Sequence, residues 1–103
     1  MANLAPIHPG EILLEEFMAP LGLSRNKLSQ ALCIPAQRVG QIVMGHRGIT
    51  VDTAIRLAHF FGTTPEFWLN LQQRYDLESA KEGALIERVE REVRTCEELQ
   101  LCA

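Results

Sequence analysis

The chain has 103 residues, of which 47% are hydrophobic, so it is long enough for one compact domain and too short for several. No stretch resembles a signal peptide or approaches the length of a membrane span, which predicts a cytoplasmic protein with no membrane partner. The formal net charge is −3, but residues 17–51 contain four bases and no acid, whereas residues 76–103 contain eight acids and four bases. An acid-free stretch of this length favours a surface that faces a polyanion.

The first predicted helix runs from Pro9 to about Ala19. Pro9 suits the first helical turn, and the helix dipole favours an acid such as Glu11 at this end. Pro20 and Gly22 are expected to stop the helix. Its apolar face comprises Ile12, Leu13, Phe17 and Met18.

Two short helices follow, one capped by Ser24 and reaching about Leu32, and one over residues 35–45. Only Cys33 and Ile34 separate them, and two short helices joined by so tight a turn form a helix-turn-helix unit. A glycine would be the most relaxed residue at the position of Cys33. The residues expected to face the core are Leu28, Ala31, Leu32, Val39, Ile42 and Val43, with the small Ser29 where the two helices approach most closely.

Three further helical segments are predicted. Thr50 caps the fourth helix, which ends at Gly62, and residues 64–66 open a fifth by a cap-then-proline pattern. Beyond Gly83 a weaker amphipathic stripe predicts either a docked sixth helix or a tail that orders on a partner. The apolar stripes are Val51, Ala54, Ile55, Ala58 and Phe61 for the fourth helix, Phe67, Trp68, Leu71 and Tyr75 for the fifth, and Ile86, Val89, Val93 and Cys96 for the last.

The outer face of the third predicted helix carries the chemistry of a base-reading helix. Glutamine pairs with adenine through two hydrogen bonds, arginine pairs with guanine in the same way, and a small apolar side chain contacts the methyl group of thymine. We therefore expect DNA bases to be read by Ala36, Gln37, Arg38 and Gln41. The residues expected to contact phosphate are Ser24, Arg25, Lys27, His46 and Arg47. The alternative, that these residues are merely solvated, fits less well because the tight turn, the helix caps and the acid-free stretch coincide.

Metal and catalytic chemistry find no support in the sequence. Cys33, Cys96 and Cys102 lack the short paired spacing of a zinc site, which favours reduced thiols. No catalytic constellation or phosphate-binding loop is present. We therefore expect no enzyme activity, no metal and no cofactor.

Four further segments carry a resemblance to a known family. They are His8-Pro9-Gly10-Glu11-Ile12-Leu13, Leu21-Gly22-Leu23-Ser24, Gly48-Ile49-Thr50 with Arg56-Leu57-Ala58, and Trp68-Leu69-Asn70-Leu71-Gln72 with Tyr75-Asp76-Leu77. On these residues the chain resembles the HigA-type antitoxins of the XRE helix-turn-helix family, over residues 7 to about 80. The resemblance implies an all-α fold with a five-helix, lambda-repressor-like DNA-binding domain over residues 1–80. The amphipathic stripe beyond Gly83 adds a C-terminal helical extension over residues 81–103.

The resemblance also implies a function and partners. It implies a homodimeric antitoxin and transcriptional repressor that binds palindromic double-stranded operator DNA and neutralises a HigB-type toxin, an mRNA endonuclease. It implies dimer contacts on the fifth helix and the extension. The candidates for dimer or partner contacts are Trp68, Leu71 and Tyr75, although the spacing of Trp68 and Tyr75 also suits the core.

Two other interpretations stay open. One is a stand-alone XRE-type transcriptional regulator without a toxin partner, which would use the same base-reading helix. The other is a protein-interaction module whose helix-turn-helix no longer binds DNA, an interpretation that the acidic net charge motivates.

Overall fold

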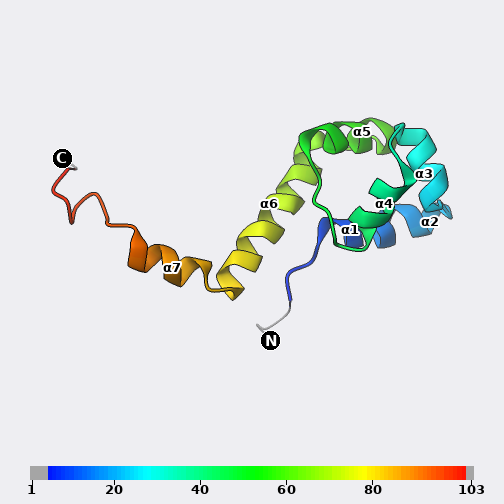
Figure 1. The fold of residues 1–103 in the computed structure, drawn as a ribbon. Coiled ribbons are helices and arrows are strands. Elements are labelled where there is room, and N and C mark those ends of the chain that lie inside the picture. The colour runs from blue at the N-terminus through cyan, green and yellow to red at the C-terminus, as the bar shows by residue number, and fades with distance from the viewer. Residues whose placement is uncertain (1–4, 102–103) are drawn as a thin grey trace.

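Helices account for all regular structure in residues 5–101, the part of the chain that this computed structural model describes (Figure 1). The elements are α1 (Pro9–Ile12), the π-helix η1 (Leu13–Met18), α2 (Ala19–Leu21), α3 (Arg25–Leu32), α4 (Ala36–Val43), α5 (Val51–Phe61), α6 (Pro65–Glu82) and α7 (Leu85–Glu92). Because α1, η1 and α2 form one continuous helical segment, residues 5–101 contain the expected five helices followed by a helical extension. The expected domain boundary after residue 80 lies inside α6, two residues before its end.

The first helical segment continues two residues past its predicted end at Ala19. Pro20 lacks an N–H, and in a regular α-helix its ring would crowd the carbonyl of Glu16, four residues earlier. The turn ahead of it is widened into a π-helix, in which the N–H of Ala19 donates to the carbonyl of Leu14, five residues back. The helix thereby accommodates Pro20 and is capped by Gly22, whose φ of +62° is left-handed.

The core lies between the first helical segment and helices α3 to α6. Trp68 is completely buried, and its indole N–H donates to Oγ1 of Thr63 at 2.8 Å. Phe17 packs against Trp68 and Phe61, with ring centroids 4.8 and 5.0 Å apart. The other buried apolar residues are Leu13, Met18, Leu28, Leu32, Ile34, Val39, Ile42, Val43, Ile49, Ala54, Leu57 and Ala58. This shared core fixes α3 and α4 relative to the rest of the domain.

Four residues on the predicted apolar faces of α3, α5 and α6 are exposed instead. Ala31 lies on the outer side of α3, Val51 and Ile55 on α5 are 60% and 52% exposed, and Phe67 on α6 is 38% exposed. The buried face of α5 consists of Thr53, Ala54, Leu57 and Ala58. Apolar residues lie on both sides of that face. The hydrophobic periodicity alone therefore predicted a buried face centred too close to Val51 and Ile55.

The beginning of α1 packs directly on α4. A Cβ atom at Gly10 would overlap the carbonyl oxygen of Ile42, so only glycine permits this approach of two backbones. The contact places α4 against the N-terminal helix as well as against the core.

His8 holds the start of α1 in place. Its Nδ1 accepts a hydrogen bond from the N–H of Gly10 at 2.9 Å, and its ring meets Tyr75 edge-on with centroids 4.8 Å apart. Burial lowers the pKa of the His8 imidazole, against the opposing effects of the Asp76 carboxylate and a hydrogen bond with the backbone of Arg47. His8 therefore links α1, the loop after α4, and α6.

The C-terminal part of α6 and the whole of α7 extend away from the other helices (Figure 1), and we call them the arm (residues 74–92). Helix α7 has no buried residue, and its apolar side chains Leu85, Ile86 and Val89 are exposed. The radius of gyration, 17.8 Å, exceeds the roughly 13 Å of a compact domain of this length. Of the two predicted alternatives, a docked sixth helix is therefore wrong for the single chain.

The cysteines differ from one another. Cys33 is free and exposed, whereas Cys96 is disulfide-bonded, which contradicts the expectation of reduced thiols. The N–H of Leu101 donates to the carbonyl of Cys96 at 3.1 Å, so the chain turns back on itself after α7 in a way that spacing did not reveal. Cys102 lies outside the described residues. Between residues 5 and 101, no helix has the length and apolarity that crossing a membrane requires.

Candidate nucleic-acid interface

The turn between α3 and α4 has the tight geometry that the sequence predicts. The N–H of Ile34 donates to the carbonyl of Ser29 at 3.1 Å, and the N–H of Cys33 donates to that of Gln30 at 3.3 Å, which closes the end of α3. Cys33 itself has a φ of +57°, the left-handed conformation in which glycine is most relaxed. Ser29 is buried, and its hydroxyl donates to the Asn26 carbonyl at 2.8 Å, so this polar side chain fits between the helices.

The outer face of α4, which we call the reading face, consists of Ala36, Gln37, Arg38 and Gln41. Ala36 and Gln37 are exposed, and Arg38 and Gln41 are partly exposed, while the opposite side of α4 is buried. Three of these side chains, with Pro35 and Arg47, line a hollow of about 180 Å³. The structure therefore brings the predicted base-reading residues together at one surface.

Arg25 and Arg47 lie next to the reading face. A Cβ atom at Gly40 would stand 3.6 Å from Nη1 of Arg25, so the guanidinium of Arg25 reaches across α4 beside this glycine. Arg47 borders the hollow from the loop that follows α4. Two guanidinium groups thus flank the polar side chains of α4.

The other three residues expected to contact phosphate lie at the start of α3 and in the loop after α4. The hydroxyl of Ser24 caps α3 by accepting the N–H of Lys27 at 3.1 Å. The side chains of Lys27 and His46 are exposed, and the backbone N–H of His46 donates to the carbonyl of Gln41 at 2.8 Å.

An ion-pair network that sequence reasoning missed reaches the reading face from α5. Nη1 of Arg38 lies 3.8 Å from Oδ2 of Asp52, and the same oxygen accepts a hydrogen bond from Nε of Arg56 at 3.0 Å. Nη1 of Arg56 in turn donates to the carbonyl of Leu32, the last residue of α3, at 2.9 Å. The four-residue spacing of Asp52 and Arg56 could have predicted their ion pair from the sequence, but the contact of Asp52 with Arg38 depends on the tertiary fold.

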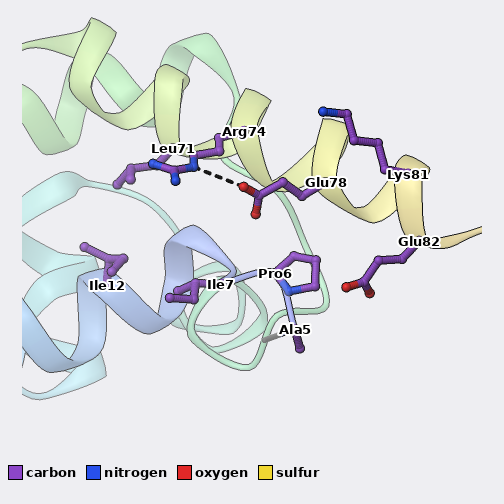
Figure 2. A pocket seen from close by; sticks show the side chains of 9 residues that line it. All are labelled: Ala5, Pro6, Ile7, Ile12, Leu71, Arg74, Glu78, Lys81 and Glu82. Atoms are coloured by element: carbon purple, nitrogen blue, oxygen red, sulfur yellow. Dashed lines mark hydrogen bonds and ion pairs between the residues drawn. The ribbon is translucent and has the colours of Figure 1, made fainter. Parts of the chain in front are cut away.

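The three residues expected at a dimer or partner contact occupy different environments. Trp68 is completely buried, so it takes the core role rather than the interface role. Tyr75 is half-buried against His8. Leu71 is half-buried and lines a groove of about 520 Å³ between the N-terminal segment and α6, together with Ile7 on the opposite wall (Figure 2).

The tight turn, the buried contact between its helices and the polar outer face of α4 define a helix-turn-helix protein. The helix-turn-helix family matches residues 14–68, more than half of the chain. Virulence-associated protein I of Dichelobacter nodosus is 50% identical over 80 residues, which are 78% of this chain and 74% of that protein.

Two solved structures are similar over most of their length. An addiction module antidote protein of the HigA family from Coxiella burnetii has a TM-score of 0.80 and 52% identity, over 89% of this chain and 99% of its own. The Pseudomonas aeruginosa antitoxin HigA, solved with the higBA promoter, has a TM-score of 0.81 and 44% identity, over 86% and 96%. The chain belongs to the helix-turn-helix family, in the XRE group with the HigA-type antitoxins.

Proposed function

We propose that this chain is the antitoxin and transcriptional repressor of a type II toxin–antitoxin operon. As a cytoplasmic homodimer it binds palindromic operator DNA, and it neutralises a HigB-type toxin, an mRNA endonuclease. The observation that carries the proposal is the reading face, which presents two glutamines and an arginine beside Arg47 with no acid in residues 17–51. The similarity to a HigA solved with a promoter supports it.

Base reading falls to the N-terminal half of α4, which enters the major groove. Gln37 and Gln41 can each pair with an adenine, Arg38 can pair with a guanine, and Ala36 can contact the methyl group of a thymine. Gly40 lies between these residues in the sequence and has no side chain of its own to hold the helix backbone away from a base pair. Four neighbouring positions thereby supply donors, acceptors and an apolar contact.

Phosphate contacts fall to both sides of α4. Arg25 and Arg47 stand nearest, and Ser24, Lys27 and His46 extend the same surface. Contacts of this kind fix the register of the protein on the duplex without selecting a sequence. The acidic net charge does not oppose this role, because most acids lie in the arm and the segment beyond it.

We assign the dimer contacts to α6 and the arm. The exposed apolar face of α7 and the groove beside α6, with Leu71 on its wall and Tyr75 nearby, are surfaces that a second copy can cover (Figure 2). One reading face contacts few base pairs, and each mismatch costs only about 1–3 kcal/mol, so two copies double the discrimination. A two-fold dimer would place the half-sites roughly 34 Å apart, one turn of DNA.

Binding to operator DNA tests the proposal directly. We would measure fluorescence anisotropy with the DNA upstream of the chain's gene and with a scrambled duplex of equal length, from about 50 to 200 mM salt. We expect tighter binding to the upstream DNA, with affinity that falls steeply as salt rises. Absence of measurable binding at the lowest salt would overturn DNA recognition and favour the protein-interaction module.

Neutralisation of a toxin needs a separate experiment. The tagged chain would be co-expressed with the open reading frame adjacent to its gene, and the eluate analysed by mass spectrometry. We expect co-elution of the two proteins and relief of growth arrest caused by the neighbour. Operator binding without a co-eluting neighbour would favour the stand-alone regulator.

A further inference from the structure

Asp52 is the acid that approaches the reading face. It is the second residue of α5, and its Oδ2 lies 3.8 Å from Nη1 of Arg38. The Asp52 side chain is 58% exposed and that of Arg38 is 32% exposed, so the pair lies at the surface where DNA would sit. An acid at this position is unexpected on a surface that faces phosphate, because it repels the polyanion.

The carboxylate of Asp52 is itself held by Arg56. Arg56 donates to Oδ2 of Asp52 at 3.0 Å and to the carbonyl of Leu32 at 2.9 Å. Since Leu32 ends α3, the chain of contacts starts at the backbone of the helix-turn-helix and finishes on the guanidinium of Arg38. Three side chains are therefore connected to a fixed point of the fold.

We propose that Asp52 is a positioning residue that orients Arg38 for base reading and so sets the sequence discrimination of the domain. The proposal rests on the DNA-binding function proposed above. A guanidinium pairs with guanine through two parallel hydrogen bonds, which demand one orientation of a side chain that otherwise samples many rotamers. Asp52 restricts that sampling before DNA arrives, and this raises the ratio of operator affinity to non-specific affinity. Its charge also weakens attraction to phosphate, which lowers both affinities together and leaves their ratio unchanged.

A purely structural role for Asp52 explains less. An acid in the first turn of α5 is favoured by the helix dipole, and its pair with Arg56 stabilises the helix surface. Neither effect requires Arg38 to lie beside the same oxygen. A structural role would also lower affinity for all DNA together with stability, and would leave the ratio of affinities unchanged.

The test compares Asp52→Asn with Glu66→Gln. Glu66 is exposed and is the second residue of α6, so the control removes the same charge from the same helical position on a helix away from the reading face. For each variant we would measure dissociation constants for the operator, for operators with single base changes and for scrambled DNA, below the melting temperature found by circular dichroism.

We expect Asp52→Asn to lower the ratio of operator to scrambled affinity by about two- to fivefold, the range for a surface ion pair. The loss should concentrate at the base that Arg38 contacts and should vanish in an Arg38→Ala background, while Glu66→Gln keeps the wild-type ratio. An unchanged ratio for Asp52→Asn, or an equal loss for Glu66→Gln, would overturn the positioning role. If the wild type itself does not discriminate, the proposed DNA function fails instead.

Discussion

Gly10 lies against the carbonyl group of Ile42, so that α1 and α4 meet through their backbones. This contact gives a physical reason for the His8-Pro9-Gly10-Glu11 segment. His8 caps the helix, Pro9 fits its first turn, Gly10 makes the close approach, and Glu11 interacts favourably with the dipole. The position of the reading face is therefore set by the N-terminal helix as well as by the core beneath α4.

Substitution of Gly10 by alanine should destabilise the domain. We expect a loss of about 1–3 kcal/mol in the free energy of unfolding, because the new methyl group forces two backbones apart. Urea unfolding followed by circular dichroism measures this loss. Gly83→Ala is the matched control, since a Cβ there would meet its nearest neighbour, the Ser79 carbonyl, at an ordinary 3.6 Å. Equal losses in the two variants would contradict the close contact.

His8 should make stability depend on pH. Burial lowers the pKa of folded His8 below that of the unfolded chain, about 6.5, although Asp76 and the Arg47 backbone oppose the shift. Stability from the neutral imidazole is therefore present above pH 6.5 and is lost as pH falls toward the lowered pKa, because a protonated Nδ1 no longer accepts the Gly10 N–H.

Urea unfolding at pH 7.5 and 5.5 tests the role of His8. Asn at position 8 keeps an N-cap acceptor without titrating near neutral pH, so His8→Asn should show a smaller loss between the two pH values. An equal loss in the wild type and the variant would assign the dependence to other groups.

Local signals predicted the helices well because they act within one turn. Ser24, Thr50 and Thr64 were expected as caps, and each accepts the N–H of the residue three positions on. The sequence also predicted that Cys33 occupies a turn position that favours glycine, and its φ of +57° confirms this.

Contacts between distant segments could not be predicted in the same way. The approach of Asp52 to Arg38 and the contact of Gly10 with Ile42 both depend on how helices cross. The prediction that Ile55 is buried was wrong for the same reason. Both sides of α5 next to its buried face carry apolar residues, and only the packing of the core determines which of them is buried. The sequence thus predicted which residues lie on the reading face, but not what holds them there.

Arg38 and Arg47 should contribute differently to DNA binding. Arg38→Ala is expected to cost about 1–3 kcal/mol on the operator and little on scrambled DNA, because it removes a base contact. Arg47→Ala should weaken both duplexes similarly and reduce the salt slope by about one, as loss of a phosphate contact does. Anisotropy titrations over a salt series measure both quantities. Equal losses on both duplexes for Arg38→Ala would contradict its base-reading role.

Gly40 should show opposite effects on stability and on DNA binding. Alanine at this helical position should stabilise the free protein by up to about 1 kcal/mol, since the nearest atom is 3.6 Å away and alanine favours helix. The added methyl group would lie beside the Arg25 guanidinium at the edge of the reading face, and we expect it to weaken operator binding. Thermal unfolding and anisotropy on the same sample measure the two effects, and unchanged operator affinity would show that the backbone of α4 does not approach the DNA.

The apolar face of α7 should be required for the proposed dimer. We expect Ile86→Asp with Val89→Asp to convert a dimer of twice the 11.6 kDa chain mass into a monomer, because charges at these positions cannot be buried against a second copy. Light scattering after size exclusion measures the mass. Arg91→Asp is the control, since residues two positions apart lie on different sides of a helix, and it should remain dimeric.

The monomeric variant should keep its helical circular dichroism and lose operator affinity, because a single reading face cannot contact both half-sites. A dimer that survives both aspartates would move the interface away from the arm.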